Sequence, residues 1–101
     1  MTTDVIIEKK SKTTINVKEP GKFNVIVCND NSTPMEFVIA MLISIFRHDE
    51  RKAVELTLKI HNEEKAIVGT YTHEVAEQKQ LDATNLARMT GWPLIIKIAP
   101  E

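Results

Sequence analysis

Hydrophobic positions are sparse at the start of the chain and regular after it. Residues 1–21 mix lysines with Thr, Ser and Glu and end at Pro20-Gly21. Within them Val5-Ile6-Ile7 is an apolar triplet, which we interpret either as a stray hydrophobic cluster or as a docking element. A segment of this composition buries too little apolar surface to fold. We therefore predict a flexible, disordered N-terminal extension over residues 1–21 and a folded core over residues 22–101.

Six segments of the core carry regular patterns. Three short runs of apolar and β-branched residues predict strands, and they cover residues 23–28, 65–71 and 94–98. Three longer stretches with apolar residues three or four positions apart predict helices, and they run from about 33 to 46, 50 to 62 and 72 to 90. The second stretch is ambiguous, because its apolar residues at 54, 56, 58 and 60 also alternate as in a strand. Its charged flanks and its length favour a helix.

Local signals mark the ends of two of these helices. Thr33 is placed to cap the first helix, with Pro34 at the first helical position and Glu36 completing a capping box. Thr72 is expected to cap the third helix, which ends at Gly91.

The resulting element order is β-α-α-β-α-β. Three strands with this few helices cannot be covered on both faces, so we expect the helices to pack on one side of the sheet. The predicted fold class is α+β, with a three-stranded antiparallel sheet packed against three helices.

Composition narrows the functional classes. A chain of 101 residues has room for one domain. Its 13 basic and 14 acidic residues argue against nucleic-acid binding, which requires neutralised phosphates. Cys28 is the single cysteine, which excludes an internal disulfide and a cysteine zinc site. The longest near-apolar run, residues 37–46, is too short to span a bilayer, and the first residues lack a signal-peptide profile. We expect a cytoplasmic protein with no membrane partner.

A screen for catalytic chemistry finds no nucleophile with a matching base. The three glycines stand far apart, so there is no glycine-rich phosphate loop. His73 and Glu77 share a helix face four residues apart, but no third ligand has matching spacing, and a solvated surface pair is the preferred interpretation. We expect neither an enzyme nor a bound metal or cofactor.

A different chemistry is suggested by residues 29–36 and His61. Asn29 and Asp30 offer amide and carboxylate acceptors, and a neutral histidine offers one acceptor nitrogen. Acceptors at the mouth of an apolar hollow would suit a protonated amine with a hydrophobic side chain attached. The hollow would be formed by Met35, Val38, Ile60 and Leu94. On spacing alone, an ordinary turn and a packed histidine explain these residues better.

Residues 25–38 read V-I-V-C-N-D-N-S-T-P-M-E-F-V. This stretch closely resembles the opening of ClpS-family adaptors, whose motif is N-D-D-x-T-P-M-E-F-V. The resemblance extends in order over residues 22 to about 98. Its further matches are Ile60-His61, Lys65-Ala66, Gly69, residues 72–79 and Trp92-Pro93-Leu94.

The resemblance implies an adaptor, or N-recognin, for substrates that begin with Leu, Phe, Tyr or Trp. It would deliver them to the N-domain of the AAA+ unfoldase ClpA or ClpC, for degradation by ClpP. The implied amine-binding residues are Asn29, Asp30, Asn31 and His61. The implied side-chain pocket is Thr33, Met35, Val38, Met41, Thr57, Ile60 and Leu94. The implied unfoldase-docking residues are Glu74 and Lys79, the extension would serve delivery, and we expect a monomer.

Two positions depart from the family pattern. Asn31 stands where the motif has a second aspartate, which removes a negative charge and would weaken amine binding or shift it to Asp30. Thr57 stands where the family has a pocket-wall methionine, which would widen the pocket or admit Ile or Val. The alternative functions are a domain that binds a translation factor or an unfoldase without recognising N-termini, and an inhibitor-like modulator of the unfoldase.

Overall fold

The computed structural model describes residues 21–101 and contains the predicted element order. Apart from Gly21, the predicted N-terminal extension lies outside the described residues. The elements are β2 (Lys22–Cys28), α2 (Met35–Ser44), α3 (Glu50–Glu63), β3 (Lys65–Thr72), α4 (His73–Met89) and β4 (Ile95–Pro100). The order β-α-α-β-α-β and the α+β class are confirmed.

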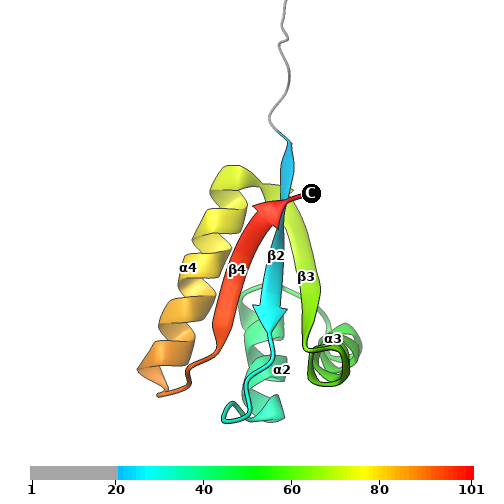
Figure 1. Cartoon of the computed structure of the whole chain (residues 1–101), viewed down its shortest axis with the longest axis vertical. Helices are drawn as coiled ribbons and strands as arrows, with labels where there is room; N and C mark the ends of the chain where they lie inside the picture. The colour runs from blue at the N-terminus through cyan, green and yellow to red at the C-terminus, as the bar shows by residue number, and fades with distance from the viewer. Residues whose placement is uncertain (1–20) are drawn as a thin grey trace, which may run out of the picture.

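The three strands form one antiparallel sheet in the order β3-β2-β4 (Figure 1). The central strand β2 is the first of the three in the chain, so β3 and β4 are added on either side of it. The register shifts between Val25 and Ile26 on the β3 side. Alternation along β2 turns Val25 and Val27 into the core, where both are fully buried.

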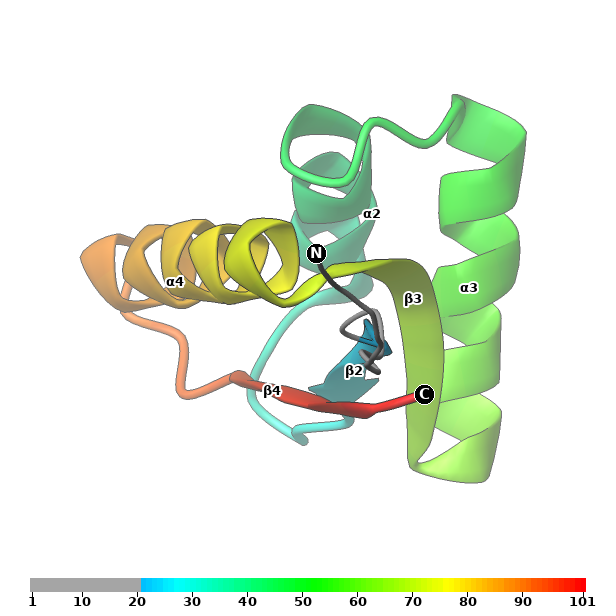
Figure 2. The same cartoon turned by 90° about the horizontal axis from the view of Figure 1, so that it is seen from above.

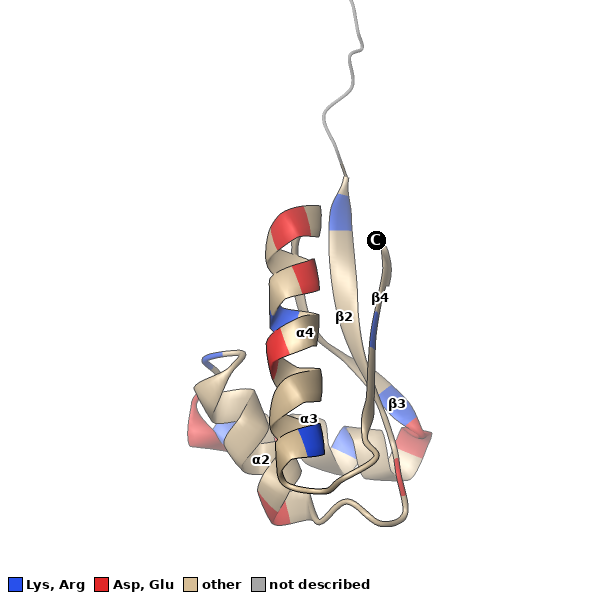
Figure 3. Ribbon diagram, turned by 90° about the vertical axis from the view of Figure 1, so that its left-hand side faces the viewer, with Lys and Arg blue, Asp and Glu red and all other residues tan. Residues whose placement is uncertain are grey.

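The helices pack against one face of this sheet. Figures 1 and 3 show α2 and α4 on the same side of the strands, and Figure 2 shows α3 beside β3 at the sheet's edge. The packing face of α4 is made of small residues, because Ala76, Ala83 and Ala87 are fully buried. Helix α3 buries one stripe of its surface against the same core, which settles the ambiguous pattern of its sequence in favour of a helix.

The predicted cap of the first helix is wrong. Pro34, not Thr33, is the N-cap of α2, because its backbone is extended (φ −69°, ψ 147°) and its carbonyl accepts from the N–H groups of Phe37 and Val38. Thr33 instead donates its hydroxyl to the carboxylate of Asp30. A charged acceptor forms the stronger hydrogen bond and holds the threonine outside the helix.

The other two helix starts differ from each other. Asp49 caps α3, since its side chain accepts from the Lys52 N–H at 2.8 Å. Thr72 is the N-cap of α4, as predicted, but its side chain makes no capping bond. The C-terminal signal of α4 is confirmed: Gly91 follows the Thr90 C-cap with φ +87°, in the left-handed region that glycine tolerates.

Candidate functional site

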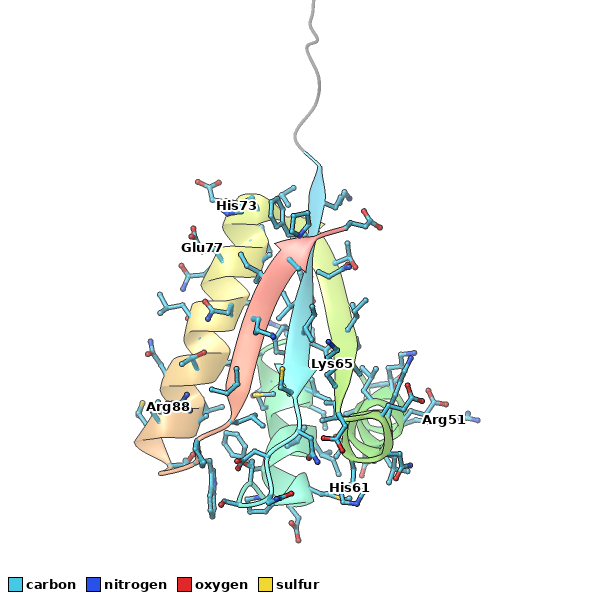
Figure 4. The ribbon with its side chains drawn as sticks, in the orientation of Figure 1. Arg51, His61, Lys65, His73, Glu77 and Arg88 are labelled. Atoms are coloured by element: carbon cyan, nitrogen blue, oxygen red, sulfur yellow. The ribbon has the colours of Figure 1, made fainter. Side chains whose placement is uncertain are left out.

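A cavity of about 160 Å³ lies where β2 ends, between the following turn and the ends of α2 and α3. It collects side chains from four separate parts of the chain. Its lining residues are Asn29, Asp30, Asn31, Thr33, Met35, Val38, Thr57, Ile60, His61 and Leu94. Figure 4 shows His61 at this end of the molecule, on α3, far from His73 and Glu77 on α4.

The turn on the cavity's rim is organised by one carboxylate oxygen. Oδ2 of Asp30 accepts from the Ser32 N–H at 3.1 Å, the Thr33 N–H at 3.0 Å and the Thr33 hydroxyl at 2.7 Å. The Asn29 N–H donates to the Glu64 carbonyl at 2.7 Å, which ties the turn to the end of α3. With Oδ2 committed to the turn, Oδ1 of Asp30 is the oxygen left for a ligand. This structural role of Asp30 was not predicted, although an aspartate before two polar turn residues is a known signal for such a turn.

The inner wall of the cavity is dry and apolar. Val38, Ile60 and Leu94 line it and are at most 5% exposed. Thr57 is the one buried polar side chain of the described residues, at 3% exposure. Its hydroxyl donates to the Ala53 carbonyl one helical turn earlier at 2.8 Å. Thr57 therefore needs no polar partner from the cavity, and a hydrocarbon group can pack against it.

The rim carries the polar groups. Thr57, Ile60 and His61 follow at i, i+3 and i+4 on α3, so one helix face supplies both apolar wall and acceptor. His61 is exposed, as are Asn31 and Met35. An amphipathic opening results, with hydrogen-bonding groups outside and hydrocarbon inside.

One predicted pocket residue, Met41, is placed elsewhere. It is fully buried and belongs to the core instead of lining the cavity. Met41 lies one turn further along α2 than Val38, on the same buried face of the helix. The structure brings the other ten predicted residues together around the cavity, and a direct role of Met41 there stays a prediction.

The predicted docking residues Glu74 and Lys79 lie on α4, away from the cavity. Glu74 is exposed. Lys79 is half-buried, with its Nζ donating to the Ile45 carbonyl at 2.8 Å and lying 5.5 Å from the centre of the Tyr71 ring. This ammonium group stabilises the negative C-terminal end of α2. Burial raises the pKa of Tyr71 above its ordinary value of 10.0.

Other candidate chemistry is sparse over residues 21–101. No group of three His, Cys, Asp or Glu side chains there is placed to hold a metal ion. His73 packs edge-on against Phe23, with ring centres 4.7 Å apart. Among the described helices, none has the length and apolar character needed to cross a membrane.

Comparison with known proteins identifies relatives over nearly the whole described chain. The family model for the ATP-dependent Clp protease adaptor protein ClpS matches residues 18–97. A Vibrio atlanticus protein named ATP-dependent Clp protease adapter protein ClpS is 41% identical over 92 residues, which cover 91% of this chain and 83% of that protein. The Rhodopseudomonas palustris protein ClpS 1 is 38% identical over 98 residues, covering 97% and 95%.

A solved structure agrees with the fold. The structure of Agrobacterium tumefaciens ClpS2 bound to L-phenylalaninamide superposes with a TM-score of 0.80 at 32% identity, and covers 82% of this chain and all of that one. The relatives are named as adaptors of a protease, not as enzymes. From the family match and these identities, the chain belongs to the ClpS family of Clp protease adaptors.

Proposed function

We propose that the cavity binds the free N-terminus of a substrate protein, with the α-ammonium group on the rim and the first side chain inside. The observation that supports this most directly is the pairing of acceptors and hydrocarbon in one opening. Asn29, Asp30 and His61 lie at its mouth, and Val38 and Leu94 lie within.

The charge of the ligand explains the choice of rim residues. An α-amino group ordinarily has a pKa of about 7.7–8.0, so most of it is protonated at neutral pH and seeks acceptors. A hydrogen bond to a charged group contributes about 1.5–3 kcal/mol. An internal residue of a protein offers a neutral amide instead, and the chain that precedes it would collide with the cavity wall.

Among the proposed first residues Leu, Phe, Tyr and Trp, the volume of the cavity matches side chains of the size of Leu and Phe. A cavity of about 150 Å³ holds a benzene ring, and this one measures about 160 Å³. Burying a Leu or Phe side chain contributes about 1.5–3 kcal/mol. With a few charge-assisted bonds, and after ordering costs, the sum corresponds to roughly micromolar affinity. L-phenylalaninamide, the ligand of the Agrobacterium relative, carries both a free α-amine and a benzyl side chain.

We further propose that the chain delivers these substrates to a Clp AAA+ unfoldase, through a surface on α4 that includes Glu74 and Lys79. Glu74 is exposed on the first turn of α4, where a partner can reach it. The Lys79 ammonium already binds the end of α2. A partner would therefore meet an ammonium group that already donates one hydrogen bond within the protein. Glu74, which is exposed, is the more accessible of the two residues.

Replacing His61 by alanine tests the proposed site. His61→Ala removes one acceptor from the charged amine, so affinity for a fluorescent Phe-first peptide should fall by about 10- to 100-fold. Anisotropy titration measures the affinity. His73→Ala is the matched control, because His73 is an exposed histidine on α4 at the opposite end of the molecule. Equal affinities of the two variants would remove His61 from the site.

A degradation assay with His61→Ala separates an adaptor from a modulator. With a Clp unfoldase, its peptidase and a Leu-first reporter, the intact chain should accelerate degradation and His61→Ala should not. Inhibition of degradation by the intact chain would favour the modulator.

Peptide affinity should depend on pH through the peptide's own α-amino group, which must be protonated to donate charged hydrogen bonds to the rim. This group ordinarily has a pKa of about 7.7–8.0, so affinity should fall as the pH rises from about 7 to 9. Titrations of a Phe-first peptide at several pH values measure the profile, and equal affinities across this range would contradict a charged ligand.

Thr57 should set which first side chains fit. Its hydroxyl is bonded within the helix and its side chain is short, so we expect room for the β-branched residues Ile and Val. Peptides that differ only in their first residue measure this preference. Thr57→Met should fill part of the cavity and lower the affinity for Ile-first peptides by roughly tenfold relative to Leu-first peptides. Undetectable binding of Ile-first peptides to the intact chain would contradict this role of Thr57.

A further inference from the structure

The face of the sheet turned away from the helices carries an ordered pattern of apolar and basic residues. Figure 1 shows β2 and β4 with no helix in front of them. In the register of the sheet, Lys65, Cys28 and Ile95 form one row across the three strands. Ile67, Ile26 and Lys97 form the next row. We call these six residues the outer-face patch.

The patch is apolar in its middle and basic at two opposite corners. Ile67 and Ile95, on the two outer strands of the sheet, are 50% and 49% exposed, so about half of each residue's surface faces solvent. Ile67 also lines a hollow of about 300 Å³, together with Ile26, Ala66, the patch residue Lys65 and one further lysine, Lys59. Within residues 21–101, no carboxylate forms an ion pair with Lys65 or Lys97. Apolar surface of this kind marks an interaction site.

The spacing of the two corner lysines defines a matching ligand. Lys65 and Lys97 are separated by two strand spacings and two residues along a strand, which places their Cα atoms about 12 Å apart. The fitting ligand is an extended segment with carboxylates about that far apart and an apolar side chain between them. A second copy of the same face carries the two lysines and no carboxylate, so it offers neither corner an opposite charge.

The chain itself contains such a segment. Residues 4–8 read Asp-Val-Ile-Ile-Glu, and they lie outside the described residues. In an extended conformation, residues 4 and 8 are about 13 Å apart, and Asp4, Ile6 and Glu8 point to the same side. The spacing and the order of charges and hydrocarbon therefore complement the outer-face patch.

The connecting chain is long enough. From Gly21, the patch begins about five residues along β2, a distance of about 17 Å. Residues 8 to 21 can span up to roughly 43 Å when extended, and a flexible linker of that length has a mean span of about 20 Å. Tethering at this length gives an effective concentration in the millimolar range. A weak contact is therefore enough to hold the segment.

From these observations we propose that residues 4–8 of this chain dock across the outer-face patch, with Ile6 over Ile26 and Cys28 and the two carboxylates against Lys65 and Lys97. Cys28 precedes Asn29 of the cavity rim. The docked segment is thus held beside the substrate site. The proposal is independent of the proposed function, because no residue of the cavity takes part in the contact.

The single thiol of the chain reports on this contact, since Cys28 lies in the patch and no other cysteine competes. We expect a small alkylating reagent to label Cys28 of the full chain roughly fivefold more slowly than Cys28 of Ile6→Ser, because the docked segment covers it. Ile15→Ser is the matched control, with the same substitution elsewhere in the extension, and it should label like the intact chain. Equal rates for Ile6→Ser and the intact chain would overturn the proposal.

A charge swap tests whether the two carboxylates of the segment contact Lys65 and Lys97. The quantity compared is the labelling rate of Cys28 with Ile6→Ser divided by the rate without it, measured in chains of otherwise identical charge, so that any direct effect of charge on the thiol cancels. This ratio should fall from about five to about 1 in a chain with Lys65→Glu and Lys97→Glu. It should rise again to about five when Asp4→Lys and Glu8→Lys are added to that chain. A ratio that ignores these charges, or that grows with protein concentration as expected for a second copy, would contradict the proposal.

Discussion

The site depends on one interaction, the threefold acceptance of hydrogen bonds by Oδ2 of Asp30. These bonds fix the turn after β2, so that Asn29, Asn31 and Thr33 face one opening. An ionised carboxylate is the acceptor best suited to this task, because charge-assisted bonds are shorter and stronger than neutral ones. The same aspartate keeps its other oxygen for a ligand. In the proposed binding mode, order in the turn and attraction for the amine would both come from this single side chain.

The apolar half of the site depends on the packing of the fold. Val38, Thr57 and Leu94 are far apart in sequence and meet because α2, α3 and the start of β4 pack around the end of β2. Arg88 supports this arrangement by donating from Nη1 to the carbonyls of Trp92 and Leu94, both at 2.8 Å. The cavity is therefore preformed, which lowers the ordering cost of binding.

Much of the fold could be predicted from sequence, because hydrophobic periodicity and turn residues directly express which faces are buried. The site residues came from a family motif and from acceptor chemistry, and ten of them line one cavity. The wrong helix cap is a case in which local pattern and nearby charge disagree. Thr33 matches a helix cap, yet the nearby charge of Asp30 binds it more strongly. Met41, also expected at the cavity, is fully buried among the core residues one turn along α2 from Val38.

The bond between Lys79 and the end of α2 had no local signal, since its acceptor is a backbone carbonyl 34 residues away. Such contacts depend on how α4 lies across the sheet, and periodicity does not specify that placement. Lys79, which the family resemblance implies as a docking residue, therefore also stabilises the fold.

The central claim is that the cavity recognises a free α-amine together with the side chain attached to it. Its most direct test compares one Phe-first peptide with the same peptide acetylated at its N-terminus, by calorimetric titration at neutral pH. Acetylation keeps the benzyl group and removes the charge, so the account predicts that affinity falls by about a hundredfold or more. Equal affinities would contradict it, because the pocket would then hold the side chain alone.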